Sequence, residues 1–219
     1  MMPDRPLRAL AGAIRSELSV RPGLPLDGLL VLLVARGQAF GTVSYEEIAD
    51  RLRVGQAGVT RLVRPLSERG EPRSGGGLLR LRTGPDPSDR YVELTAAGEA
   101  LCDRLCRADP DRADPTGARL LDALLAFRSA VRGGHLRDLA LLIDLGEAGL
   151  APDEGRPFPN GSGQMRRLRE AGLLDRSGPS SRPRLRPAPL SDEGRALLRR
   201  LSGPGPDPAD GAAPPDGPA

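Results

Sequence analysis

The side chains with the clearest potential for chemistry in this sequence lie on one predicted helix, over residues 57–69. An amide, a hydroxyl and two guanidinium groups mark its start and outer face: Gln56, Thr60, Arg61 and Arg64. An arginine can donate two hydrogen bonds to a guanine, and a glutamine can pair with an adenine edge. The spacing therefore predicts a helix that reads base edges in a DNA major groove.

Further arginines fall on a predicted β-hairpin over residues 78–94. Alternation along its first strand points Leu79 and Leu81 inward. The cationic residues expected on this hairpin are Arg80, Arg82 and Arg90. An arginine gains from the negative potential of an A·T-rich minor groove, so the hairpin has the chemistry of a minor-groove contact. The other interpretation is that all these arginines are ordinary solvated charges in an arginine-rich chain.

Catalytic and metal-binding chemistry has little support in the sequence. Cys102 and Cys106 lie one helical turn apart and His135 is the only histidine, so cysteine and histidine cannot supply four zinc ligands. We favour small core residues for the two cysteines over a metal site or an oxidant sensor. The chain has no Gly-rich phosphate loop with lysine and no nucleophile–histidine spacing. We therefore expect no catalytic residue, no metal, no cofactor and no enzymatic activity.

Two short helices joined by a tight turn must position the base-reading face. Ser44 followed by Glu47 is a capping box that begins the first helix. The second helix is anchored by apolar residues at i, i+3, i+4 and i+7: Val59, Leu62, Val63 and Leu66. Pro65 removes one backbone hydrogen bond, which predicts a kink and not a break. Residues 24–36 are apolar nearly all round, as expected of a buried helix beneath this pair.

Four segments, taken in this order and spacing, resemble the MarR family of winged helix-turn-helix transcription regulators: IADRL (48–52), VTRLVRPLSERG (59–70), DPSDR (86–90) and LTAAGEAL (94–101). The resemblance covers residues 24–108. It implies a recognition helix over 57–69 and a wing over 78–94. It also implies that Arg90 is the tip contact of the wing, supported by Asp86 or Asp89.

The chain departs from the family pattern at two places near the wing. It inserts EPRSGGG (71–77) before the first strand, and it carries Tyr91 where a second arginine often follows Arg90. These departures bear on the shape of the wing.

A second set of patterns, after residue 118, parallels the first. Two apolar stripes predict helices: Leu120, Leu124, Phe127 and Val131, then Leu136, Leu139, Ala140 and Ile143. The segment SGQMRRLREAGLLDR (162–176) parallels the helix that ends at Gly70. A shared L-(S/T)-x-x-G-x-A-L pattern joins Leu94, Thr95, Gly98, Ala100 and Leu101 to Leu190, Ser191, Gly194, Ala196 and Leu197. The segment APDEGRPFPNG (151–161) replaces the first helix of the pair, and its prolines and glycines predict no regular helix.

We predict a mainly α-helical chain with small β-hairpin wings (α+β), organised as a tandem winged helix-turn-helix. The predicted divisions are a winged-helix domain with an N-terminal helix (1–108), a linker (109–117), a degenerate second winged-helix-like domain (118–202) and a disordered Pro/Gly/Asp tail (203–219). No run of about 18 to 20 apolar residues is present to span a membrane. With no secretion signal either, we expect a cytoplasmic protein without a membrane partner.

The preferred hypothesis is a sequence-specific transcription regulator whose partner is double-stranded DNA. An N-terminal stripe packs either in a dimer interface, as the resemblance implies, or on its own domain: Leu7, Leu10, Ala11, Ile14 and Leu18. The protein would accordingly be a homodimer, or an intramolecular pseudo-dimer in which the second unit mimics a partner subunit. The resemblance alone suggests a small-molecule effector, whose identity the sequence does not show.

The alternative is a tandem winged-helix module that binds proteins and has no specific DNA affinity. The degenerate second unit and a net charge of only +3 favour this alternative, although all 32 cationic side chains are arginines. The two hypotheses differ in one measurable property, because only DNA binding through arginines weakens steeply with added salt.

Overall fold

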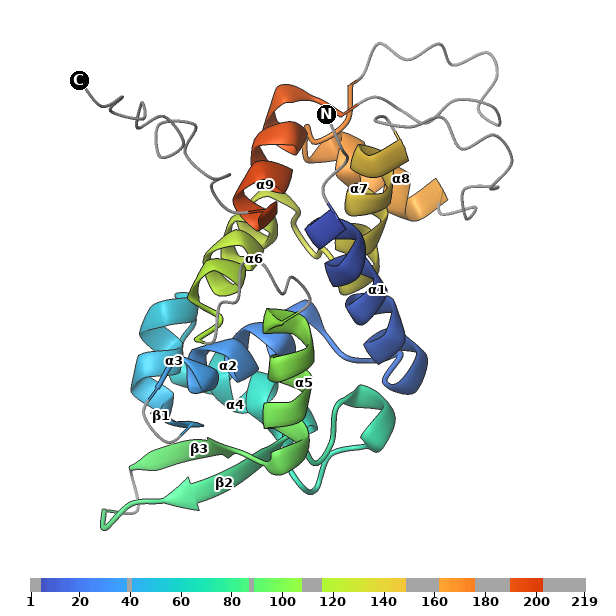
Figure 1. The fold of residues 1–219 in the computed structure, drawn as a ribbon. Coiled ribbons are helices and arrows are strands. Elements are labelled where there is room, and N and C mark those ends of the chain that lie inside the picture. The colour runs from blue at the N-terminus through green and yellow to red at the C-terminus, as the bar shows by residue number, and fades with distance from the viewer. Residues whose placement is uncertain are drawn as a thin grey trace, which may run out of the picture.

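Helices account for most of the described chain, and its strands form a small antiparallel sheet (Figure 1). The structure is a computed structural model that describes residues 5–38, 41–86, 89–107, 116–148, 162–175 and 190–202. The helices are α1 (Arg5–Val20), α2 (Leu26–Arg36), α3 (Tyr45–Leu52), α4 (Gln56–Val63), α5 (Ala96–Cys106), α6 (Ala118–Ala130), α7 (Leu136–Ala148), α8 (Ser162–Glu170) and α9 (Asp192–Ser202). The strands are β1 (Thr42–Ser44), β2 (Leu79–Thr83) and β3 (Arg90–Leu94). The coarse fold class predicted from the sequence is confirmed.

Several predictions fall on residues that the structure does not describe. They concern most of the linker, the Pro- and Gly-rich segment 151–161 and the tail 203–219. The division into two domains stays a prediction, since one cluster of buried side chains joins both halves. No helix in the described part of the chain is long and apolar enough to cross a membrane.

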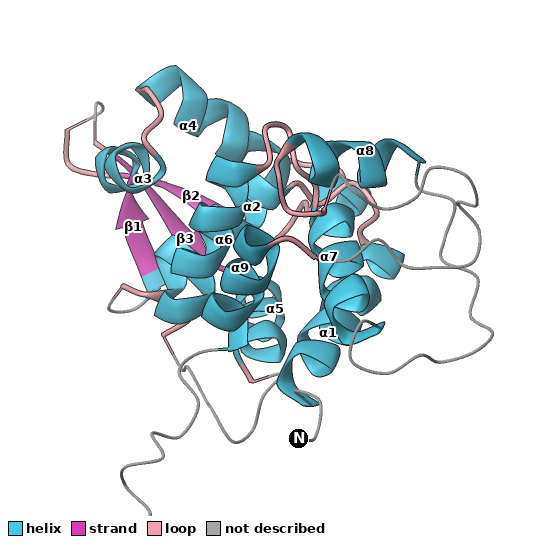
Figure 2. Ribbon diagram, turned by 90° about the horizontal axis from the view of Figure 1, so that it is seen from above, coloured by secondary structure: helices cyan, strands magenta, loops and turns pink. Residues whose placement is uncertain are grey.

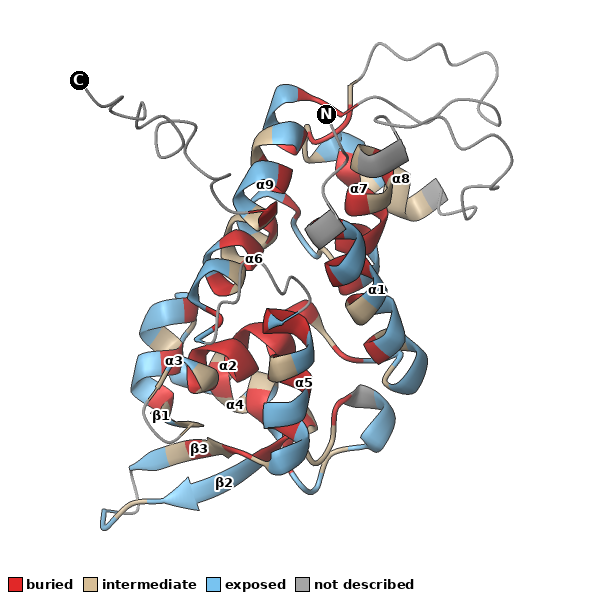
Figure 3. Ribbon diagram, viewed as in Figure 1, coloured by how far each residue is buried: buried red, intermediate tan, exposed pale blue. Residues whose placement is uncertain are grey.

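Helix α2 lies at the centre of the first half of the chain. Of its first ten residues only Asp27 is not buried, as the apolar run predicted. Helices α3, α4, α5 and α6 and strand β3 pack around it, and Figure 3 shows it as an almost continuous buried segment. A helix enclosed on all sides is a rigid base for the two short helices α3 and α4.

The predicted hairpin forms, and a third strand adds to it. Strand β3 lies between β1 and β2, with Leu79 facing Leu94 and Thr83 facing Arg90 across the hairpin. The sequence was expected to form only a turn before Ser44, so β1 was missed. The inward direction of Leu81 is also wrong, because this side chain is 47 % exposed. Leu79 on the same strand is fully buried, so the core covers the start of β2 and does not extend to Leu81.

The predicted second helix of the pair is shorter than expected. Helix α4 ends at Val63 and the chain continues as a 3-10 turn at Arg64–Leu66, so the helix does not reach residue 69. Pro65 has no N–H to donate to the carbonyl of Arg61, which ends the α-helical ladder there. The prediction of a kinked but continuous helix was therefore wrong, although Leu66 is still fully buried.

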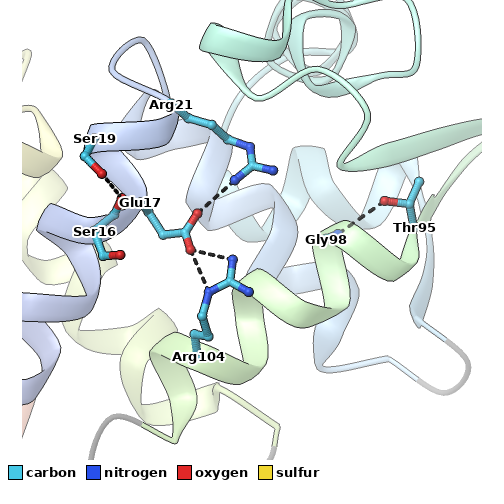
Figure 4. A network of polar contacts seen from close by, with 7 residues as sticks. All are labelled: Ser16, Glu17, Ser19, Arg21, Thr95, Gly98 and Arg104. Atoms are coloured by element: carbon cyan, nitrogen blue, oxygen red, sulfur yellow. Dashed lines mark hydrogen bonds and ion pairs between the residues drawn. The ribbon is translucent and has the colours of Figure 1, made fainter.

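The N-terminal helix α1 packs on elements of both halves. Its predicted stripe is buried apart from Leu18, which is half-buried, and it contacts α7 and α5. The buried carboxylate of Glu17 accepts hydrogen bonds from Arg21, at 2.9 Å, and from Arg104 on α5, at 2.7 Å (Figure 4). Two guanidinium groups thus compensate the one buried charge of α1, which ties this helix to the end of α5.

The sequence parallel between the two halves extends to matched hydrogen bonds. Thr95 accepts from the N–H of Gly98 at 3.2 Å and donates to a loop carbonyl at 2.6 Å. Ser191 accepts from the N–H of Gly194 at 3.0 Å and donates to a loop carbonyl at 2.6 Å. Both residues cap the helix that follows, α5 in the first half and α9 in the second. The predicted parallel is therefore a parallel of backbone geometry as well.

Candidate nucleic-acid interface

Local sequence determines how α3 and α4 meet. Ser44 caps α3, because its hydroxyl oxygen accepts from the N–H of Glu47 at 3.1 Å. Helix α3 ends at Leu52, and the residue after it, Arg53, has a left-handed backbone with φ of 52°. Gly55 then caps α4 in an extended conformation. This short turn seats α4 against α3 and α2, and its anchor residues Val59 and Val63 are fully buried.

The predicted base-reading residues lie on the opposite side of α4. Gln56, Arg61 and Arg64 are exposed, whereas Thr60 is half-buried and donates its hydroxyl to the carbonyl of Gln56 at 3.2 Å. Arg61 donates to the carbonyl of Ala57 at 3.3 Å. Among the described residues, no carboxylate pairs with Arg61 or Arg64. Their two positive charges are therefore available to an anionic partner.

The arginines of the wing divide into two kinds. Arg80 pairs with Glu68 at 3.0 Å, and Arg82 pairs with Glu93 at 2.8 Å. Arg90 is exposed at the start of β3, next to the tip of the hairpin. The sequence analysis missed the two glutamate partners, whose charges offset those of the arginines. The hairpin register alone would not have found these pairs, because it sets Arg80 opposite Glu93 and Arg82 opposite Tyr91, and Glu68 lies outside the hairpin.

The aspartates expected to support Arg90 act through their backbone. The N–H of Asp89 donates to the carbonyl of Asp86 at 2.9 Å, and the N–H of Gly84 donates to the carbonyl of Asp89 at 2.7 Å. The support that Asp86 or Asp89 was expected to give Arg90 stays a prediction. Burial raises the pKa of Tyr45, and the positive charge of Arg90 lowers it in part. Arg90 thus lies close enough to act on the first residue of α3.

Helix α8 of the second half carries its arginines differently. Arg167 donates to Asp138 on α7 through two nitrogen atoms, at 2.9 and 2.8 Å, and this carboxylate is fully buried. Arg166 lies 3.6 Å from Glu170 on the same helix. Only Arg169 of this group is exposed with no carboxylate partner among the described residues. Helix α8 therefore offers less uncompensated charge than α4 does.

An arginine of α6 holds the turn between α3 and α4. Arg128 pairs with Asp27 of α2 at 2.7 Å and donates to the carbonyl of Leu52, the last residue of α3, at 2.8 Å. The sequence analysis did not single it out, because neither partner is near it in the chain. Arg128 is a positioning residue, since it connects the second half to the helix that supports α4.

A hollow of about 520 Å³ lies where α2, α4 and the turn before α7 meet, and Pro25, Leu62, Arg128 and His135 are among its lining residues. The arginine in this hollow is already paired, so the hollow does not indicate which ligand it would bind, and the small-molecule effector stays a prediction.

The described residues contain no group of three or more histidine, cysteine or acidic side chains that would hold a metal ion. No family model matches the chain, and no curated protein is significantly similar to it.

Proposed function

We propose that this protein is a MarR-type winged helix-turn-helix regulator that binds double-stranded DNA in a sequence-specific manner. Helix α4 enters the major groove, and the β2–β3 hairpin contacts the minor groove beside it. The observation that carries this proposal is the charge of α4. Its buried face is anchored by Val59 and Val63, while Arg61 and Arg64 are exposed and have no carboxylate partner within the part of the chain that the structure describes. A helix fixed on one side and cationic on the other matches the geometry of major-groove recognition.

The tandem organisation belongs to the same proposal. The second half carries a helix (α8), an isolated antiparallel bridge between Leu174 and Leu190, and a capped helix (α9) in the order of α4, the hairpin and α5. We interpret this half as a degenerate winged-helix unit. Its matched capping hydrogen bonds at Ser191 support that interpretation.

The decisive experiment measures affinity for a duplex at several salt concentrations. Fluorescence anisotropy with a duplex from the region upstream of the gene should give a specific complex, and R61A/R64A should weaken it. Because Arg61 and Arg64 are proposed to contact base edges, each loss should cost about 1 to 3 kcal/mol of affinity for the specific duplex and reduce the preference for it over other sequences. R166A/R169A on α8 is the matched control, with two arginines removed from a helix not assigned to DNA.

A protein–protein interaction module is the second candidate function. The pairing of Arg80 with Glu68 and of Arg82 with Glu93 favours it, because these pairs reduce the positive charge of the wing. This candidate predicts little affinity for any duplex and no steep dependence on salt. If R61A/R64A binds DNA as tightly as the unchanged protein, the roles proposed for α4 are wrong.

A further inference from the structure

The two halves of the chain exchange their first helices. Helix α1 of the first half packs on α7 of the second, and α6 of the second half packs on α2 of the first (Figures 1 and 2). The other packing pairs also correspond, since α1 contacts α5 as α6 contacts α9, and α2 contacts α4 as α7 contacts α8. This reciprocity is the pattern of a twofold-symmetric pair in which each member lends a helix to the other.

The exchanged helices share a short sequence, and its arginine pairs with an aspartate of the other half in each case. The segment AIRS (13–16) of α1 recurs as AFRS (126–129) of α6, and in both the apolar residue is buried. Arg15 of α1 bonds Asp144 of α7 at 2.6 Å. Arg128 of α6 bonds Asp27 of α2 at 2.7 Å. The two arginines correspond in sequence, whereas their acceptors do not, because Asp27 is the second residue of α2 and Asp144 is the ninth of α7.

The backbone contacts that follow α4 match those that follow α8, and the starts of α5 and α9 match as well. These contacts fix which residue of the first half corresponds to which residue of the second. The N–H of Leu78 donates to the carbonyl of Leu66 at 3.0 Å, and the N–H of Leu173 donates to that of Leu168 at 2.9 Å. A Cβ added at Gly98 or at Gly194 would in each case lie 2.3 Å from a carbonyl oxygen. Equating Leu66 with Leu168 then places residues 60–63 of α4 opposite residues 162–165 of α8.

The correspondence shows that the second half has lost the chemistry proposed for α4. The position of Arg61 is taken by Gly163, and that of Arg64 by Arg166, which is next to Glu170. The position of Pro65 is taken by Arg167, whose charge is neutralised by the buried Asp138. Within its described residues, α8 therefore packs as α4 does but lacks the unpaired arginines of α4 at the corresponding positions.

We propose that the chain is a self-contained pseudo-dimer that stays a monomer, alone and on DNA, and that reads one half-site through α4. Its own second half covers the faces of α1 and α2 that a second copy would need. The preferred partner is consequently a duplex with a single, non-palindromic half-site, bound by one chain. The part that concerns DNA rests on the function proposed above, whereas the monomeric state does not.

The first test is the mass of the full chain by light scattering, free and with a duplex in excess. We expect the 23.1 kDa of one chain, and one chain per duplex. Joining a second inverted half-site, about 34 Å away, should change the affinity less than twofold. A dimer in solution, or two chains required per duplex, would overturn the proposal.

The second test locates the exchanged helix within one chain. In R15C/D144C, a short bis-maleimide should join the two introduced cysteines and leave a band of monomer mass. The reagent should react only there, because both cysteines of the natural sequence are buried. Cross-linked dimers would instead mean that α1 exchanges between two chains. A cross-linked monomer that binds no DNA would overturn the proposed function and leave the pseudo-dimer standing, so the two failures are distinguishable.

Discussion

The ion pair between Arg167 and Asp138 offers the most direct test of how the second half holds together. Asp138 is fully buried and accepts three hydrogen bonds, two from Arg167 at 2.9 and 2.8 Å and one from the N–H of His135 at 2.8 Å. The variant Arg167→Met keeps the aliphatic packing of the side chain and removes two of those donors. The carboxylate then remains buried with one donor and no countercharge.

The expected cost follows from the burial of each partner. Removing one member of a buried pair costs about 3 to 5 kcal/mol. The side chain of Arg167 is 28 % exposed and Asp138 keeps the His135 donor, so we expect the lower end, about 3 kcal/mol. At about 2 to 4 °C per kcal/mol for a chain of this size, the midpoint of thermal unfolding should fall by about 6 to 12 °C.

Urea unfolding followed by circular dichroism gives the free energy, and calorimetry gives the midpoint. Arg169→Met on the same helix is the matched control, because Arg169 is exposed. The double variant Arg167→Met with Asp138→Leu should recover most of the loss, since an apolar pair removes the stranded charge. A single variant within about 0.5 kcal/mol of the Arg169 control would refute the reasoning.

Three further predictions concern the repeat, a buried thiol and the wing. Gly98→Ala and Gly194→Ala should each destabilise the protein by about 1 to 3 kcal/mol, because the added Cβ has no room beside a carbonyl oxygen. Burial, with the neighbouring cysteine adding to it, raises the pKa of Cys102 from 9.0 to about 12, so the native protein should resist alkylation at pH 8. The unfolded thiol ionises first, so this group should lower the unfolding free energy as pH rises above 9, by about 1.4 kcal/mol per unit. Arg90→Ala should reduce the salt slope of duplex binding by about 1 and Arg82→Ala by less, because Arg82 is already paired.

Matched variants control these measurements. Gly12→Ala in α1 has open space around its Cβ and should stabilise the protein, by about 0.5 to 1 kcal/mol. The difference between the unchanged protein and Cys102→Val isolates the thiol from other groups that titrate above pH 9. Equal effects of Arg82→Ala and Arg90→Ala on the salt slope would mean that the ion pair on the wing does not shield its arginine. Free alkylation of the folded protein would show that Cys102 is accessible.

Sequence by itself determined the local structure of this protein. The caps at Ser44 and Thr95 depend on a side chain and an N–H three residues away, and the apolar face of α4 depends on helical periodicity. Such features follow from the geometry of a few consecutive residues. Even the error at Pro65 was local, since the lost hydrogen bond was identified and only its effect on the length of the helix was misjudged.

Tertiary structure alone decided which charges remain available and which helices meet. Arg82 and Arg90 look equivalent in the sequence, but Arg82 pairs with Glu93, diagonally across the hairpin, and Arg90 starts the opposite strand at the tip. Asp138 and Arg167 are 29 positions apart, and α1 packs on α7 across most of the chain. The physical reason is that burial and ion pairing depend on distances in space, which the packing of whole elements sets and short-range periodicity does not contain.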